Sequence, residues 1–178
     1  MADSSWVTEF STFVRAHSTA LLRSAFLLTG DLAAAEDLVQ DTFLRLFQRW
    51  SLVMAADVPL AYVRRSMTNN FLNSRRGRAR HEVLFADPPE HGYDDDLAGP
   101  LSDRQLVRGL LAELPPKQRA VLVLRFYCDL SDAQIAADIG CRQGTVRSII
   151  SRGLGALRAE TERRPRPRDT SPTNGNLR

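Results

Sequence analysis

Two clusters of residues in this chain have side chains suited to recognising nucleic acid, and the first begins at Arg142. Arginine can contact guanine edges or phosphates, and serine and threonine hydroxyls can donate or accept hydrogen bonds in a groove of DNA. At 100° per residue, the polar positions after Arg142 share one face of a helix, whereas Val146, Ile150, Gly153 and Leu157 share the other, which is expected to be buried. The residues expected to face DNA are Arg142, Thr145, Arg147, Ser148, Ser151 and Arg152.

The segment before this helix has the pattern of a helix-turn-helix unit. Ser131 can cap a short helix, and Gly140 supplies the turn that ends it. In such a unit the second helix enters the major groove of DNA. An ordinary polar surface helix would look similar, but two further basic residues, Arg125 and Arg158, favour the DNA-binding interpretation.

The second cluster lies on a helix that is expected to run from Pro59 to about Arg76. Asparagine can read bases through its paired donor and acceptor, arginine can grip phosphates, and aromatic rings such as Tyr62 and Phe71 can stack on unpaired bases. This mixture suits single strands as well as duplexes, although a solvated basic helix with a few buried aromatic residues would look similar. The polar members of the cluster are Arg64, Arg65, Asn69, Asn70, Asn73, Arg75 and Arg76.

A third candidate surface lies on the helix that is expected from Leu32 to Trp50. Val39 and Leu46 belong to a face that should pack, and a polar, acid-rich face lies opposite. A leucine in the middle of that polar face fits the docking of a protein partner, although singly exposed leucines are common. The residues of this docking face are Asp37, Gln40, Asp41 and Leu44.

Charge is distributed unevenly along the chain. Residues 1–80 carry ten basic and seven acidic side chains, residues 81–103 carry seven acidic and no basic ones, and residues 104–178 carry fourteen basic and seven acidic ones. A basic surface gains affinity for polyanions by releasing counterions from phosphates. The two basic segments therefore predict two modules that face nucleic acid, unless they are ordinary solvated surfaces.

The hydrophobic periodicity predicts an all-α chain of two small helical domains joined by an acidic flexible linker. Apolar residues recur at three- and four-residue spacing, and no alternating pattern of convincing length indicates a strand. The linker is indicated by proline, glycine and a run of three aspartates, and the tail by its arginine, proline and serine content. The expected order is a first domain over 1–80, the linker over 81–102, a helix-turn-helix domain over 103–160 and a disordered tail over 161–178.

Several classes of protein are disfavoured by the sequence. No apolar run approaches the ~20 residues that cross a bilayer, and no basic flank followed by an apolar stretch indicates a signal peptide. Cys128 and Cys141 lack the paired spacing of a zinc site, and no glycine-rich phosphate loop or nucleophile with its base is evident. We therefore expect a cytoplasmic protein that is not an enzyme, with no catalytic residue, no metal and no cofactor.

Two segments resemble the signatures of the extracytoplasmic-function (ECF) sigma factors, the small two-domain class of bacterial sigma-70-like transcription initiation factors. They are Ala35-Glu36-Asp37-Leu38-Val39-Gln40-Asp41-Thr42-Phe43, and Gly144-Thr145-Val146-Arg147-Ser148 followed by Ser151-Arg152-Gly153-Leu154. Leu114-Pro115-Pro116-Lys117-Gln118-Arg119 resembles the usual start of the second domain. The Leu-Leu-Thr-Gly-Asp run at 27–31 and Tyr62-Val63-Arg64-Arg65 resemble a SigE-like subgroup common in high-GC bacteria. The resemblance covers residues from about 8 to 160.

The resemblance implies a protein that binds core RNA polymerase, directs it to promoters through the −10 and −35 elements and assists promoter melting. It implies that the docking face binds the clamp coiled coil of the β′ subunit, and it adds the β flap as a further polymerase contact. The helix from Pro59 and the loop before it would melt and read the −10 element, with Asn69 helping to hold a flipped base. The second domain would read the −35 element, with Arg125 toward a phosphate.

The resemblance also gives the linker a role, because the −7 charge of residues 81–103 could imitate nascent RNA in the RNA channel of polymerase. Whether an anti-sigma factor binds the chain is left open. Two positions depart from the family pattern. Ile149 stands where many relatives carry a polar or basic residue, and its place beside the buried arc is consistent with packing. Ser66-Met67-Thr68 is unusual for the −10 helix, so the sequence does not predict the promoter.

Three other functions stay open from the sequence. A conventional regulator would dimerise or sense a ligand through its first domain and would bind a palindromic duplex without polymerase. An interaction protein could carry basic segments that serve only solubility. An enzyme of an unrecognised type is disfavoured for want of a site.

Overall fold

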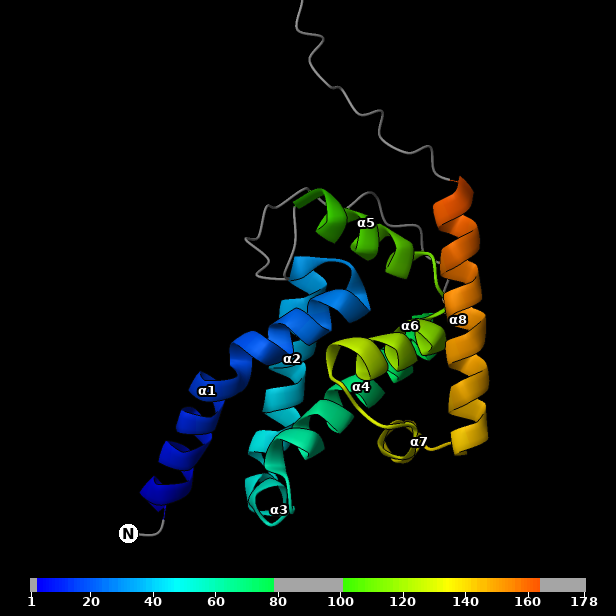
Figure 1. Ribbon diagram of the computed structural model, residues 1–178. Helices are drawn as coiled ribbons and strands as arrows, with labels where there is room; N and C mark the ends of the chain where they lie inside the picture. Colours follow the sequence, from blue (N-terminus) through cyan, green and yellow to red (C-terminus); the bar gives the residue numbers. More distant parts are fainter. Residues whose placement is uncertain (1–2, 79–100, 164–178) are drawn as a thin grey trace, which may run out of the picture.

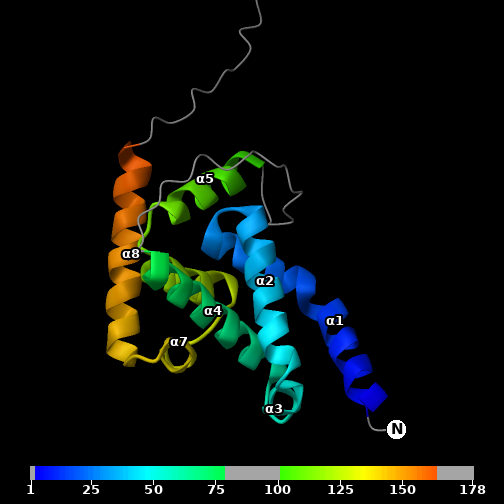
Figure 2. The ribbon, with the colours of Figure 1, turned by 180° about the vertical axis from the view of Figure 1, so that it is seen from behind.

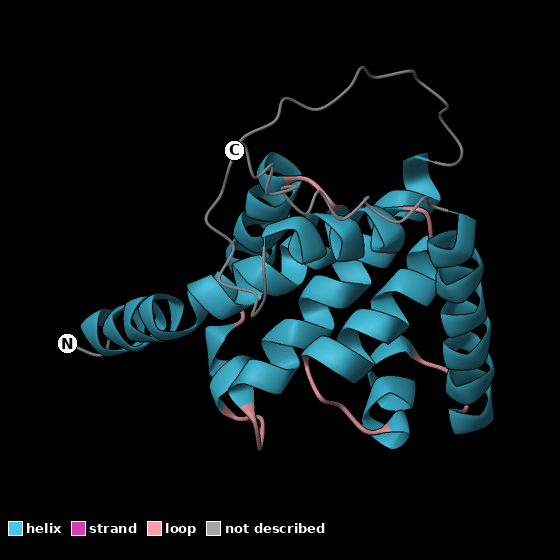
Figure 3. Ribbon diagram, turned by 45° about the horizontal axis from the view of Figure 1, so that its top comes forward, coloured by secondary structure: helices cyan, strands magenta, loops and turns pink. Residues whose placement is uncertain are grey.

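The computed structural model describes residues 3–78 and 101–163, and every regular element in these ranges is a helix (Figure 3). The expected all-α fold is confirmed for this part of the chain. The expected linker over 81–102 and the expected tail lie almost entirely outside the described residues, as do the side chains of Arg75 and Arg76.

The N-terminal half forms four helices: α1 (Asp3–Thr29), α2 (Leu32–Phe47), α3 (Trp50–Met54) and α4 (Pro59–Arg78). Helices α1 and α2 lie side by side (Figures 1 and 2). The turn between them needs a left-handed residue, which Gly30 supplies with a φ of 79°. Asp31 then caps α2, because its carboxylate accepts a hydrogen bond of 2.8 Å from the amide of Ala34.

Two boundaries in this half differ from the expected ones. Trp50 does not end α2 but begins the separate short helix α3, where it is buried and meets the rings of Phe10 and Phe13 with centroids 5.1 Å away. Part of the expected loop from Ser51 is therefore helical. Helix α4 also continues to Arg78, past its expected end at about Arg76.

The C-terminal half forms α5 (Leu101–Ala112), α6 (Pro116–Leu122), the π-helical turn η1 (Val123–Tyr127), α7 (Asp132–Ile139) and α8 (Gln143–Arg163). Helices α7 and α8 are the expected helix-turn-helix. Ser131 caps α7 in a capping box with Gln134, and Gly140 ends it with a φ of 65°. The last turns of the segment that begins at Pro116, Val123–Tyr127, widen from an α-helix into the π-helical η1.

The two halves pack directly against each other. One hydrophobic core contains Leu28, Met67 and Phe71 from the N-terminal half together with Leu111 and Leu122 from the C-terminal half. A second, smaller core lies inside the helix-turn-helix and includes residues of α6, η1, α7 and α8; its buried members are Val121, Leu124, Leu130, Ile135, Ala136, Val146 and Ile149. The described part of the chain is thus one packed body (Figure 1), and a local core lies under α8.

A buried arginine ties the two halves together. The Arg119 guanidinium donates to the carbonyl of Leu28, at the end of α1, over 2.8 Å. It also donates to the carbonyls of Ala112 and Leu114 over 2.6 and 3.2 Å. Helix C-termini leave carbonyls without intrahelical partners, so Arg119 satisfies groups that would otherwise be buried alone.

Candidate nucleic-acid interface

The recognition face of α8 is exposed as the periodicity predicted. Val146, Ile149 and Gly153 point into the core of the helix-turn-helix and are buried. The buried position of Ile149 confirms that this departure from the family pattern is a packing residue. The six expected DNA-facing side chains are all exposed: Arg142, Thr145, Arg147, Ser148, Ser151 and Arg152.

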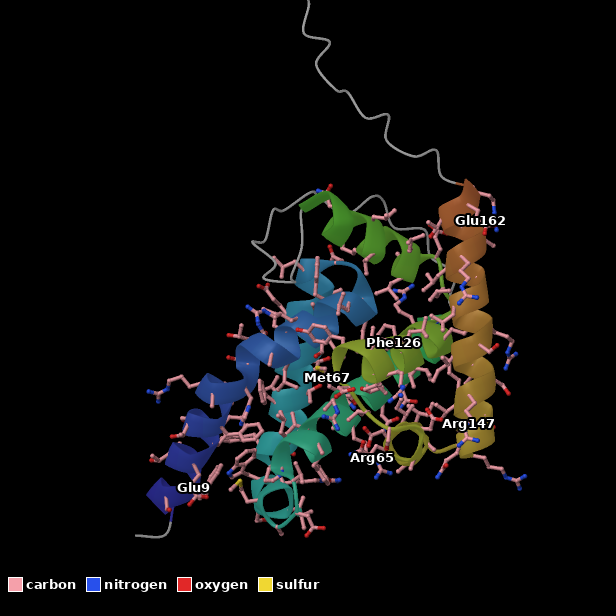
Figure 4. The ribbon with its side chains drawn as sticks, viewed as in Figure 1. Glu9, Arg65, Met67, Phe126, Arg147 and Glu162 are labelled. Atoms are coloured by element: carbon pink, nitrogen blue, oxygen red, sulfur yellow. The ribbon has the colours of Figure 1, made fainter. Side chains whose placement is uncertain are left out.

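An ion pair fixes the direction of one of these arginines. The Nε atom of Arg147 donates to the Asp132 carboxylate at the start of α7 over 3.0 Å. A guanidinium held through Nε still has both terminal nitrogens free for a bidentate contact with guanine or phosphate. Figure 4 shows Arg147 on the α8 side of α7 and Arg65 on the α4 side. The contact of Asp132 with Arg147 was not predicted from the sequence.

Arg125 makes a contact within the chain that the sequence did not predict. Its Nη1 atom donates to the carbonyl of Leu130 over 2.8 Å, and the side chain is half-buried, while its expected contact with a DNA phosphate stays a prediction. That carbonyl lies in the loop between η1 and α7. We conclude that Arg125 holds the loop that leads into the helix-turn-helix.

The residues of the second cluster separate into different environments on α4. Arg65 and Asn73 are exposed, whereas Asn70 donates to the hydroxyl of Thr42 on α2 over 3.2 Å. Asn70 therefore joins two helices of the N-terminal half. Arg64 and Asn69 point at α7.

The contact between α4 and α7 is made by Asp138, which the sequence did not single out. Its carbonyl accepts a hydrogen bond of 3.1 Å from the Asn69 amide, and its carboxylate lies 3.8 Å from an Arg64 nitrogen. Burial raises the pKa of the Asp138 carboxyl, and the positive charges of Arg64 and Arg65 oppose that rise. The only hint in the sequence was that Asp138 is an acidic residue in a basic segment. Its contact with Asn69, which lies 69 residues earlier in the chain, could not be predicted from a local pattern.

The docking face on α2 is exposed. Asp37, Gln40 and Asp41 are open to solvent, and Leu44 has 68% of its surface exposed. Val39 and Leu46 lie on the buried side of the helix, as expected. A groove of about 380 Å³ runs between α2 and α4 beside this face, and its lining includes two acids of α2, Asp37 and Asp41, and two amides of α4, Asn70 and Asn73.

Other kinds of site are not formed by the described residues. No three His, Cys, Asp or Glu side chains in residues 3–78 and 101–163 come together as a metal site would need. None of the described helices is long and apolar enough to cross a membrane. Cys128 and Cys141 are free thiols.

The fold and these surfaces define a two-module DNA-binding protein with a helix-turn-helix. Residues 13–81 match the family model of sigma-70 region 2, and residues 110–159 match that of sigma-70 region 4. The chain is 39% identical over 158 residues to the RNA polymerase sigma-E factor of Streptomyces avermitilis, covering 89% of this chain and 88% of that one. It is 37% identical over 147 residues to the ECF RNA polymerase sigma factor SigL of Mycobacterium tuberculosis, covering 80% and 82%. The chain belongs to the ECF sigma factors of the sigma-70 family.

A solved structure gives the same result. The sigma factor RpoE of Bartonella quintana, in complex with the anti-sigma factor NepR, matches with a TM-score of 0.71 and 26% identity. The match covers 88% of this chain and 99% of that one. Proteins of this family are transcription initiation factors without catalytic activity. The prediction that the chain is not an enzyme therefore follows from its membership of the family.

Proposed function

We propose that this chain brings core RNA polymerase to promoters by reading the −35 element with α8 and the −10 element with α4 and the loop before it. The observation that carries the proposal is the α8 face, on which hydroxyl and guanidinium groups are exposed above a fully packed local core. Such a face can enter a major groove without rearrangement. The proposal divides the chain into a first domain over 1–80, a linker over 81–102 and a second domain over 103–160, as the charge pattern favours.

The −10 reader is assigned to the first domain. Arg64, Arg65 and Asn69 supply cations and an amide on α4, and Asn73 adds another amide one turn later. Bases that leave the duplex during melting cost a few kcal/mol each, and stacking and amide contacts to the extruded strand offset that cost. Asn70 takes a structural part in this proposal because its amide is bonded to Thr42.

Polymerase binding is assigned to the α2 face. An exposed leucine within a rim of acids has the composition of a docking anchor, and we assign Asp37, Gln40, Asp41 and Leu44 to the β′ clamp coiled coil. The second domain would contact the β flap. Docking holds two weak DNA readers at a fixed separation, so their affinities combine through effective concentration. We place this function in the cytoplasm, where RNA polymerase acts.

An anti-sigma partner is also part of the proposal. The Bartonella quintana relative was solved with an anti-sigma factor, and this chain has the same fold over 88% of its length. We expect a partner of that kind to restrain the present chain by covering the same docking and DNA-binding faces.

Run-off transcription from a genomic library tests the proposed function. Core polymerase with the purified chain should give discrete transcripts that neither component gives alone. Asp41→Arg should abolish these transcripts and polymerase binding while circular dichroism stays unchanged. Glu162→Arg, which changes the charge equally at an exposed site near the end of α8, is the matched control (Figure 4).

Two outcomes would contradict the proposal. Tight binding to a palindromic duplex without transcripts would indicate a conventional regulator. Normal polymerase binding by Asp41→Arg would remove the α2 face from the docking model.

A further inference from the structure

Asp132, the first residue of α7, contacts the recognition face of α8 from a different helix, and α7 lies beside the first turns of α8 (Figures 1 and 2). Its Oδ2 atom accepts a hydrogen bond of 3.0 Å from the Nε atom of Arg147. The two side chains differ in exposure, because 70% of the Arg147 side chain but only 25% of the Asp132 side chain is open to solvent. The carboxylate is therefore a mostly covered support for an exposed guanidinium.

The place of this carboxylate is set by the fold of the helix-turn-helix. The capping box of Ser131 and Gln134 fixes the residue at which α7 begins, and that residue is Asp132. Buried residues of α7 and α8 share one small core, which fixes the separation of the two helices. The N-terminus of a helix attracts negative charge, so this position favours a carboxylate. Asp132 thus has a defined place from which to act on α8.

A hydrogen bond through Nε restricts an arginine without using the atoms that recognise a base. Each terminal nitrogen of a guanidinium carries two N–H groups, and together they match the N7 and O6 acceptors of guanine in the major groove. An unrestrained arginine has many rotamers, and it loses that freedom when it binds. Arg147 is restrained before it binds, so contact with a base requires less ordering and its direction is defined.

The charge of Asp132 acts in a second way. Phosphates attract any nearby cation whatever the base sequence, and they supply most of the non-specific affinity of a DNA-binding protein. A carboxylate 3.0 Å from Arg147 offsets part of its positive charge and repels an approaching phosphate. Base edges carry no net charge, so this repulsion affects them less. The same group therefore favours contact with bases over contact with the backbone.

We propose that Asp132 is a positioning residue that determines specificity in the −35 reader. It directs Arg147 to one base pair whose major-groove edge presents two acceptors, as guanine does, and it lowers the affinity of α8 for DNA of unrelated sequence. This role rests on the proposed function of α8 as the reader of the −35 element. Exposed ion pairs contribute little to the stability of a fold, so the pair acts on DNA binding rather than on folding.

Arg152 supplies a comparison within the same face. Its Nε atom donates to the Ser148 carbonyl over 3.2 Å, so it is also held through Nε. That acceptor is neutral and belongs to the main chain of α8, so α7 takes no part in this bond. Loss of the Asp132 carboxylate should therefore change the base preference due to Arg147 and leave that due to Arg152 unchanged. A general loosening of α8 would change both.

Asp132→Ala is the direct test, because it removes both the acceptor and the charge. Asp132→Asn separates the two effects, since the amide keeps an oxygen that can accept from Arg147 but carries no charge. Asp129→Asn is the matched control, because the chemical change is the same and Asp129 is exposed in the loop before α7. Asparagine also tolerates the φ of 51° at this position. Arg147→Ala and the double variant with Asp132→Ala complete a double-mutant cycle.

The base preference is measured with holoenzyme assembled from core polymerase and the full chain. The probe is a pool of duplexes with one randomised window, and sequencing of the bound fraction gives the preference at each position of the enriched motif. A second measurement titrates the unselected pool with the full chain alone at one fixed salt concentration, and it reports the affinity for DNA of unrelated sequence. Circular dichroism checks that each variant is folded.

Arg147→Ala should lose the preference at one base pair, and Asp132→Ala should weaken the preference at the same base pair by about threefold to tenfold. Asp132→Ala should also bind the unselected pool about twofold more tightly, because phosphates then meet an uncompensated cation. Asp132→Asn should keep most of the base preference and show the same gain on the unselected pool. Asp129→Asn should match the wild type in base preference. In the Arg147→Ala background, Asp132→Ala should change no base preference.

The outcomes separate the positioning role from the proposed function. An enriched motif that Asp132→Ala leaves as unchanged as Asp129→Asn does would overturn the positioning role alone. So would a weakened preference at every position of the motif, or an equal effect of Asp132→Ala with and without Arg147, because both would make Asp132 a merely structural residue. A wild-type holoenzyme that enriches no motif, or a motif that Arg147→Ala leaves unchanged, would reject α8 as the −35 reader and the positioning role with it.

Discussion

The two surfaces assigned to DNA are presented in opposite ways. The α8 face is set by a core that belongs to the helix-turn-helix, with Val146 and Ile149 buried beneath it. The α4 face lies at the boundary between the halves, and the same helix gives Met67 to the shared core and Asn69 to α7. The α8 face is exposed and supported by its own core, so it can bind DNA as it stands. Arg64 and Asn69 on α4 are in contact with α7, so they can reach DNA only after α7 moves away.

The largest effect is expected from the open face. Arg147→Ala combined with Arg152→Ala should weaken binding to a −35 duplex by about a hundredfold or more, because each arginine that contacts a base contributes roughly 1–3 kcal/mol of discrimination. Arg158→Ala, which removes an exposed cation further along α8, should cost much less. Fluorescence anisotropy at one fixed salt concentration measures all three affinities. Equal losses in all variants would mean that α8 contributes only general charge.

The local core under α8 has its own test. A Cβ atom at Gly153 would stand 3.0 Å from Leu122 Cδ1 and 3.3 Å from Leu122 Cγ, whereas nothing lies within 4 Å of one at Gly155. Gly153→Ala should therefore lower the free energy of unfolding by about 1–3 kcal/mol through overpacking. Gly155→Ala should raise it by roughly 0.5–1 kcal/mol, because alanine is the better helix former. Urea unfolding compares them, and equal stability would show that α6 and α8 pack loosely.

The open face is also the one that the sequence predicted well. Its exposed residues, the Ser131 cap and the Gly140 turn all follow from spacing within one short segment, although Ile149 rather than Ile150 is the fully buried isoleucine. Periodicity reports the two faces of a helix and nothing about what lies opposite. The capture of Asn69 by Asp138 and the bonds of Arg119 to Leu28 join residues 69 and 91 positions apart, so no local pattern could reveal them.

Two smaller differences between the sequence-based predictions and the structure also come from contacts between residues of different elements. Asn70 was grouped with the DNA-binding residues because of its type, but its amide is used by Thr42 of the neighbouring helix. Arg125 was predicted to contact a phosphate, and the structure adds a bond to the Leu130 carbonyl that the sequence did not predict. A residue type limits what a side chain can bind, and tertiary packing decides which partner it meets.

The covered face should show its function in kinetics. Asn69→Ala should slow promoter opening by about tenfold while closed-complex formation stays nearly unchanged, because the amide acts on a base only after it leaves the duplex. Asn73→Ala, one turn further along α4 and exposed, should have a smaller effect. Stopped-flow measurement of opening with a fluorescent base in the −10 region separates the two steps. An equal effect on both steps would argue against base capture.

The smallest effect is a pH dependence of the covered face. Burial raises the pKa of Asp138 in the folded chain, and Arg64 and Arg65 lower it in part. Unfolding returns the carboxyl to its ordinary pKa of about 3.9, so between that pH and the raised value the folded chain binds more protons than the unfolded one. Stability contributed by this group is therefore present below about pH 3.9 and is lost as the pH rises through the raised pKa.

A comparison with Asp138→Asn isolates this contribution from the other carboxyls. The amide does not titrate, so the free energy of unfolding of the wild type should fall relative to that of Asp138→Asn as the pH rises from about 4 to 7. The charged and titratable groups that face Asp138 are Arg64, Arg65 and Cys128, and burial raises the pKa of the Cys128 thiol. Urea unfolding at several pH values measures the difference. A wild type that gains stability relative to Asp138→Asn with rising pH would mean that the attraction between Arg64 and Asp138 outweighs the desolvation of the carboxylate.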